Sequence, residues 1–222
     1  MQKWLTRLGV IVGGAVLSFS LMGIAAADDA ALLQKAWSAY NIGHYKEALN
    51  FLHPLAQDGN TTAQILIGRC YENGLGVPQN VEEAVKWYKL AAEKNDTQAQ
   101  VALAYCYELG VGVPKDPKET VDLMRKAANA GNAEAQFNLA LYLGKGQYGV
   151  KKDHVKSFEW AIKSARQGYA QAERLVGAYY EAGIGIKQDQ ALSREWYAKA
   201  KAKGLERDGS IFKTIKSVTP QK

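Results

Sequence analysis

One segment of about 36 residues occurs four times in this chain and keeps the same register throughout. The copies begin at Thr61, Thr97, Ala133 and Ala170, at intervals of 36, 36 and 37 residues. A fixed period of this length is the signature of a solenoid, in which each repeat packs only on its neighbours. Such a fold presents one continuous concave surface, so we expect recognition by a surface and not a single deep catalytic pocket.

Each copy is predicted to form a helical hairpin. Small and apolar residues recur at helical spacing before and after a turn, as in Ala63, Leu66 and Cys70 followed by Ala84 and Tyr88. A pair of glycines separates the two helices, because glycine takes a positive φ without a side-chain penalty and lets the chain turn back. The first two copies carry these pairs as Gly74 with Gly76 and Gly110 with Gly112.

The second helix of each repeat has a recognisable start. Asp116, Pro117 and Glu119 stand at the N-cap, first and third helical positions, so the amides at this end gain side-chain acceptors. Asn80 with Glu83 repeats this capping arrangement. Asp153 and Asp189 keep the cap without the glutamate.

These residues resemble the Sel-one-like repeats, a subfamily of the tetratricopeptide-like hairpins. The shared pattern is AQ-x-x-LG-x-x-Y-x-x-G-x-GV, then Asp or Asn, then A-x-x-WY-x-x-A, with its tryptophan position held by Trp87, Trp160 and Trp196. The resemblance implies an all-α, right-handed α-solenoid with repeats at 61–96, 97–132, 133–169 and 170–205. Residues 28–60 look like a shorter tetratricopeptide hairpin, and residues 206–222 look like a C-terminal cap or tail.

The N-terminus has the organisation of a bacterial secretory signal peptide. Lys3 and Arg7 precede an apolar stretch over residues 8–24, and the small residues Ala25-Ala26-Ala27 follow. We expect residues 1–27 to be cleaved before Asp28; the alternative is an uncleaved membrane anchor, since the stretch is near the minimum for a span. Cleavage predicts a periplasmic or secreted protein with no membrane span.

The net charge of the chain bears on the kind of partner that it binds. Loss of Lys3 and Arg7 lowers the formal net charge from +6 to +4, and the lysines are scattered among acidic residues, so no nucleic-acid partner is predicted.

Cys70 and Cys106 occupy the same offset in successive repeats, which places their helices about 8–10 Å apart. A disulfide needs closer Cα atoms, so we expect two free core thiols.

The sequence offers little catalytic chemistry. The three histidines lack the paired spacing of a zinc site, so neither a metal nor a cofactor is predicted, and no catalytic residue is assigned. Ser210 and Lys213 form a Ser-x-x-Lys match to penicillin-recognising enzymes, an activity linked to some Sel-one-like repeat proteins. The required Ser-Asp-Asn and Lys-Thr-Gly partners of that signature are missing.

The tetratricopeptide register implies which residues line the concave face, where that superfamily holds peptides. Aromatic and arginine residues dominate binding hot spots, and several stand at these positions. Aliphatic and Phe positions on this face, such as Val101, are expected to pack between helices instead. The predicted partner-binding groove comprises Trp37, Tyr40, Arg69, Glu72, Tyr105, Glu108, Phe137, Leu141 and Arg174.

The sequence therefore predicts a non-enzymatic periplasmic adaptor or regulatory protein that binds a protein or an extended peptide. One alternative is an immunity protein that neutralises a type VI secretion toxin such as a phospholipase, since some immunity proteins are built from Sel-one-like repeats. The other alternative is a β-lactam hydrolase. A neighbouring toxin-like gene would favour the immunity protein, and nitrocefin turnover would favour the enzyme.

Overall fold

A computed structural model describes residues 17–207, with side chains described from residue 28 onward. This part of the chain contains ten α-helices and no strand. The helices are α1 (Leu17–Asn41), α2 (Tyr45–Gln57), α3 (Thr61–Asn73), α4 (Val81–Glu93), α5 (Thr97–Leu109), α6 (Pro117–Asn129), α7 (Ala133–Lys145), α8 (His154–Arg166), α9 (Ala170–Ala182) and α10 (Gln190–Ala202).

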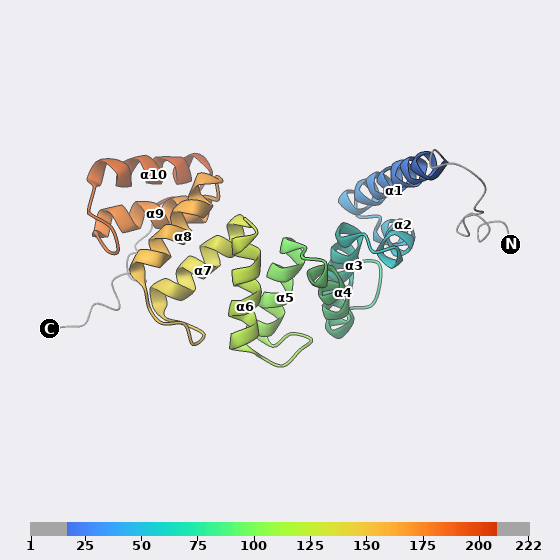
Figure 1. Ribbon diagram of the computed structural model, residues 1–222, viewed down its shortest axis with the longest axis horizontal. Helices are drawn as coiled ribbons and strands as arrows, with labels where there is room; N and C mark the ends of the chain where they lie inside the picture. Colours follow the sequence, from blue (N-terminus) through green and yellow to red (C-terminus); the bar gives the residue numbers. More distant parts are fainter. Residues whose placement is uncertain (1–16, 208–222) are drawn as a thin grey trace.

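The helices pair into five hairpins that follow one another along a curved row (Figure 1). Each helix packs on the one before it and the one after it, and the first helices α3 and α5 of successive repeats also touch. Buried apolar residues fill the space between neighbouring hairpins along the whole row; the largest include Leu52, Leu66, Met124, Leu139 and Val176. The chain is thus the right-handed α-solenoid that the repeat pattern predicts.

The first glycine of each pair ends the first helix, as expected. Gly74 and Gly110 have φ values of +67° and +75°, and their amides donate to the carbonyls of Cys70 and Cys106. This left-handed C-cap satisfies a carbonyl that the helix end would otherwise leave unpaired. The equivalent residues in the last two repeats, Gly146 and Gly183, have the same conformation.

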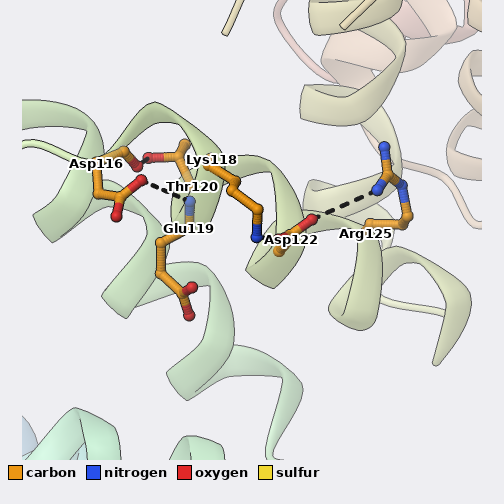
Figure 2. A network of polar contacts seen from close by, with 6 residues as sticks. All are labelled: Asp116, Lys118, Glu119, Thr120, Asp122 and Arg125. Atoms are coloured by element: carbon orange, nitrogen blue, oxygen red, sulfur yellow. Dashed lines mark hydrogen bonds and ion pairs between the residues drawn. The ribbon is translucent and has the colours of Figure 1, made fainter. Parts of the chain in front are cut away.

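The second helices begin at the predicted caps, with one difference. Asp116 accepts a hydrogen bond from the Glu119 amide at 3.0 Å, and the Thr120 hydroxyl donates to the Asp116 carbonyl (Figure 2). Asp122 is held on the same helix by Lys118 and Arg125. In a capping box the glutamate side chain would accept from the N-cap amide, but here the Asp116 amide donates to the Tyr107 carbonyl at 3.1 Å and so closes the loop onto α5.

The third repeat accommodates its extra residue by a third left-handed position in the turn, beside the two that the other repeats have. Tyr148 has φ +55°, Gly149 has φ +77°, and the Tyr148 ring packs edge-on against Tyr142 at 4.8 Å. Its hydroxyl donates to Glu108 of the preceding repeat at 2.7 Å. The insertion therefore adds a contact between repeats and leaves the helix register intact.

The first helix starts earlier than the sequence boundary implies. We expected the first hairpin to begin at residue 28, whereas α1 runs without interruption from Leu17 to Asn41 across the predicted cleavage position. Among the described residues, no helix has both the length and the hydropathy of a membrane span. The start of the predicted signal peptide and the tail from residue 208 lie outside the described residues.

The two cysteines are free and buried, as predicted. Burial raises the pKa of the Cys70 thiol and of the Cys106 thiol to about 11 each, so both stay protonated at neutral pH. Since the thiolate is the reactive form, we expect both thiols to resist labelling in the native chain. Denaturation without reductant should then release both for reaction with a thiol reagent. A count of zero would show that the two residues form a disulfide in solution.

Candidate functional site

An aromatic cluster lies at the N-terminal end of the solenoid. Trp37 on α1 is 37% exposed, which makes it the most exposed tryptophan among the described residues. Its ring packs edge-on against Tyr40 at 6.1 Å, and Tyr40 packs in turn against Tyr45 at 5.2 Å. The cluster therefore holds a large apolar side chain at the surface in a supported position.

Arg69 and Glu72 of α3 lie beside this cluster. Desolvation raises the pKa of the Tyr40 phenol, and the neighbouring Cys70 and Glu72 raise this pKa further. The Arg69 guanidinium lowers it. Arg69 and Glu72 therefore both lie near the phenol. Arg69 is exposed, whereas Glu72 accepts a hydrogen bond from the Tyr88 hydroxyl at 2.8 Å. The predicted groove residues Trp37, Tyr40, Arg69 and Glu72 thus gather at one place on α1 and α3.

The hydroxyl of Tyr105, the next predicted groove residue, makes its hydrogen bonds within the chain. Its hydroxyl donates to Glu134 at 2.8 Å and accepts from the Asn138 amide at 2.8 Å. Burial raises the pKa of Tyr105, and the bond to Glu134 raises it further. Both partners lie on α7, so this phenol joins the first helices of two successive repeats.

Glu108 also makes its hydrogen bonds inside the chain. It accepts from the Tyr142 hydroxyl at 2.9 Å and from the Tyr148 hydroxyl at 2.7 Å. Both donors belong to the following repeat. The carboxylate is half-buried, so its role in this structure is to tie the second repeat to the third.

The C-terminal groove positions are less exposed than the N-terminal ones. Phe137 packs against Tyr169 with ring centroids 5.4 Å apart, and Leu141 packs on the buried cluster around α8 and α9. Arg174 is half-buried and makes contacts within the chain. Val101 is buried, as expected for an aliphatic position that packs between helices.

A hydrogen bond between the two helices of a hairpin occurs in two repeats and is not among the sequence-based predictions. Glu72 and Glu181, at the same repeat position, each accept a hydrogen bond from a second-helix tyrosine of their own hairpin, Tyr88 and Tyr197, at 2.8 and 2.9 Å. The signal was present, because the glutamate and the tyrosine recur at one fixed offset in the first and fourth repeats. The register predicts Glu72 to be a groove residue, whereas in the structure its carboxylate joins the two helices of its own hairpin.

The described residues contain no cluster of three or more potential metal-ligating side chains. The His44 side chain makes an exposed contact with Glu47 at 3.4 Å, and His53 packs against the edge of Trp87. Burial lowers the pKa of His154, the third histidine. Ser210 and Lys213, the basis of the β-lactam hydrolase alternative, lie outside the described residues.

Comparison with solved structures finds the same architecture elsewhere. A Sel1 repeat protein from Oxalobacter formigenes is 30% identical and superposes with a TM-score of 0.75, covering 85% of this chain and 78% of that one. A protective antigen of uropathogenic Escherichia coli is 29% identical, with a TM-score of 0.71, covering 92% of this chain and 48% of that one. The immunity protein Pa5087 of Pseudomonas aeruginosa shares the fold at 18% identity and a TM-score of 0.56, covering 80% of this chain and 66% of that one.

Sequence comparison gives a shorter match and a family. The chitin synthase regulator SKT5 of Saccharomyces cerevisiae is 33% identical over 61 residues, which is 28% of this chain and only 9% of that protein. The family model for the Sel1 repeat matches residues 61–96, 97–132, 133–169 and 170–205. Proteins of this kind are generally non-catalytic modules for protein–protein interaction. Four consecutive matches over most of the described chain establish that it belongs to the Sel1 repeat family.

Proposed function

We propose that this chain is a non-enzymatic adaptor that binds a partner protein or an extended peptide through the surface formed by Trp37, Tyr40 and Arg69. The observation that carries the proposal is the exposed Trp37 ring, which packs on Tyr40. The exposed Arg69 of the next first helix lies near the Tyr40 phenol, whose pKa it lowers. Tryptophan, tyrosine and arginine are the residues most enriched at binding hot spots. We call these three residues the Trp37 surface.

The Trp37 surface is a better candidate than the middle of the predicted groove. There, the Tyr105 hydroxyl and the Glu108 carboxylate already bind partners on the following repeat. Their substitution would disturb packing between repeats as well as any contact with a partner. Arg69, in contrast, is exposed, so a partner carboxylate can reach its guanidinium.

We place the adaptor in the periplasm on the basis of the predicted signal peptide at residues 1–27. An immunity role would use the same kind of surface, with a secreted toxin as the partner. The identity of a captured partner separates the two, because an immunity protein must protect cells against the protein that it binds.

The test is affinity capture from a periplasmic extract, followed by measurement of the dissociation constant for the captured partner. Trp37→Ala and Arg69→Ala should each weaken binding by about 1–2 kcal/mol, which is a rise in dissociation constant of roughly 5- to 30-fold. The melting temperature should change little, because both side chains are exposed and neither is part of the buried core.

Matched controls are available on the second helices. Leu90 is an exposed apolar residue of α4, and Arg166 is an exposed arginine of α8. Leu90→Ala and Arg166→Ala should leave the dissociation constant unchanged. Equal binding by the wild-type chain and the Trp37→Ala, Arg69→Ala double variant would rule out the Trp37 surface.

A further inference from the structure

Charge is distributed unevenly between the two ends of the solenoid. Residues 28–144 carry ten lysines and arginines against fourteen carboxylates, whereas residues 145–207 carry thirteen against seven. Of these thirteen basic side chains, all but Lys152 and Arg174 are exposed, while four of the seven carboxylates are buried or half-buried. Although acidic residues occur among the lysines all along the sequence, the surface at the C-terminal end is therefore strongly basic.

The excess is concentrated where two second helices end, α8 and α10, at the C-terminal end of the row (Figure 1). The last turn of α4 has no basic residue and that of α6 has only Lys126, whereas the last turns of α8 and α10 have two each. Lys203, just after α10, donates to the carbonyl of Gly168, just after α8, at 2.7 Å, so the two helix ends lie close together. The four basic residues of these two last turns, which we call the basic edge, are Lys163, Arg166, Lys199 and Lys201.

Two lysines of the basic edge lie over tryptophan rings. The Lys163 ammonium is 4.1 Å from the centroid of the Trp160 ring, and the Lys199 ammonium is 4.0 Å from that of the Trp196 ring. Both rings are half-buried, so each pair presents an indole together with an exposed cation. The first two repeats each lack one member of this pair, because the first has leucine at the lysine position and the second has leucine at the tryptophan position.

The charges of the basic edge are largely uncompensated within the chain. No carboxylate among the described residues forms an ion pair with Lys163, Arg166 or Lys199. Lys201 lies 3.4 Å from Glu206, but both side chains are exposed, and ion pairs of this kind contribute little. These cations are therefore available to an anionic surface outside the chain.

We propose that the basic edge docks the C-terminal end of the solenoid on a lipid membrane that contains anionic phospholipids. The negative potential of such a membrane attracts lysine and arginine, and its interface accommodates tryptophan rings and the apolar stems of lysines. An acidic protein would use the charges alone. A nucleic acid would stack its bases on open aromatic faces, whereas lysine ammonium groups lie over these two rings. This surface is separate from the Trp37 surface and does not depend on it.

The sequence beyond Arg207 is consistent with a membrane as the partner. Arg207 bonds to Glu181 and lies 5.6 Å from the Tyr197 ring centroid, so the described chain ends on the hairpin that carries Lys199. Residues 208–222 lie outside the described residues, but their sequence has apolar residues at helical spacing with lysines between them, a pattern typical of segments that lie in a membrane interface. The apolar residues are Ile211, Phe212, Ile215 and Val218, and the lysines are Lys213 and Lys216.

The test is co-sedimentation of the full chain with vesicles of phosphatidylcholine alone, or of phosphatidylcholine and phosphatidylglycerol in equal parts. The chain should bind the phosphatidylglycerol vesicles more tightly. This preference should disappear when the salt is raised from about 0.1 M to about 1 M, which shortens the Debye length from about 10 Å to about 3 Å. Any contribution of the uncharged apolar stretch at residues 8–24 is common to all variants.

The double variant Lys163→Gln, Lys199→Gln should weaken binding to the phosphatidylglycerol vesicles by about 25-fold, since each lysine near an anionic surface contributes about fivefold. Its melting temperature should not change, because both side chains are exposed. Equal binding of the wild-type chain to the two kinds of vesicle would overturn the proposal. Unchanged binding by the double variant would overturn it as well.

A matched control removes two exposed lysines from the first two repeats. Lys89→Gln, Lys126→Gln lowers the net charge by the same amount, and Lys126 occupies the repeat position of Lys163 and Lys199. Because these lysines lie on α4 and α6, away from the basic edge, their loss should change vesicle binding by less than about twofold. A loss equal to that of the basic-edge variant would mean that net charge alone drives binding, which contradicts a docking surface at α8 and α10.

Two further measurements separate the basic edge from the tail and the membrane from other polyanions. In a Lys213→Gln, Lys216→Gln background, the basic-edge substitutions should still weaken vesicle binding by about 25-fold; loss of this difference would assign the binding to the tail and overturn the proposal. Poly-L-glutamate and single-stranded DNA offer charge without a bilayer interface, so each should bind about tenfold or more weakly than the phosphatidylglycerol vesicles at equal concentrations of anionic groups. Equal affinity for either polymer would show that the basic edge recognises that polymer and not a membrane.

Discussion

Replacement of Gly112 by alanine is expected to lower the free energy of unfolding by about 2–4 kcal/mol. Gly112 has φ +69°, a conformation that costs a residue with a Cβ about 1 kcal/mol. A Cβ built there would also lie 2.5 Å from the carbonyl oxygen of Val81, at the start of α4 in the preceding hairpin. That oxygen is a backbone atom, so the helix must move to relieve the overlap, and overpacking of this kind adds about 1–3 kcal/mol.

Gly149→Ala provides the matched control. Gly149 has φ +77°, and a Cβ at this position would meet no heavy atom within 4 Å. Its substitution should therefore cost only the conformational term of about 1 kcal/mol. Urea denaturation of both variants measures the difference in their free energies of unfolding, provided that the dependence of this free energy on urea concentration is the same in both. Equal losses would mean that the close approach of Gly112 to α4 does not limit how the hairpins stack.

The equivalent glycines explain why the turn recurs. A Cβ at Gly76 would lie 2.8 Å from the backbone of Tyr45 and Lys46, and one at Gly185 would lie 2.4 Å from the His154 carbonyl. Each contact is with the start of the preceding second helix. The glycine pair thus serves two purposes, because the first residue ends a helix and the second lets the next hairpin approach.

The fold could be predicted from the sequence because its determinants are local. The left-handed C-cap at Gly74 and the N-cap at Asn80 depend on residues within one turn, and both are found where the pattern places them. The repeat then multiplies each local signal by four, which fixes the order and length of the helices. The early start of α1 at Leu17 is the exception, since no repeat pattern extends into that region.

The candidate site was less predictable because side-chain partners are not local. The register places Tyr105 and Glu108 on the first helix, but it does not show that α7 supplies their hydrogen-bond partners 29 to 34 residues later. Tyr148 donates to Glu108 only because the third repeat has an inserted residue there. A one-dimensional pattern gives the face on which a residue lies and leaves open what that residue contacts.

The repeat tryptophans show a similar limit. The repeat pattern places Trp87, Trp160 and Trp196 on second helices, where truncation to alanine costs about 3–5 kcal/mol if the ring is fully buried and less if it is half exposed. All three are half-buried, and lysine ammonium groups lie 4.1 Å from the Trp160 ring and 4.0 Å from the Trp196 ring. Their truncation should therefore cost less than that range.

Where the two helices of a hairpin touch, the sizes of the two facing residues vary together from repeat to repeat. A Cβ at Gly68 would lie 2.4 Å from the Tyr88 ring, and one at Gly177 would lie 3.0 Å from the Tyr197 ring. The other repeats carry alanine at the first position and a non-aromatic residue at the second, as Ala104 with Met124 and Ala140 with Ala161. Glycine is thus found where the opposing helix brings a tyrosine, which indicates that the two positions are coupled.

We expect Gly68→Ala and Tyr88→Met to be strongly non-additive. Gly68→Ala should cost about 1–3 kcal/mol, since the fully buried Tyr88 ring cannot move aside and the gain in helix propensity offsets only part of the overlap. Tyr88→Met alone should also be destabilising, because it removes the hydroxyl bond to Glu72 and leaves unfilled space beside Gly68. The double variant recreates the pair that the second repeat uses, so its new methyl group fills that space.

Urea denaturation of the four proteins in this cycle gives the coupling energy directly. The double variant should be more stable than the sum of the single losses predicts, by about 1–3 kcal/mol. Tyr88→Phe serves as a control, since it keeps the ring and removes only the bond to Glu72; combined with Gly68→Ala it should show no such recovery. Additive losses in the Met cycle would mean that the glycine and the tyrosine are set independently, and that the pairing across the four repeats has no energetic basis.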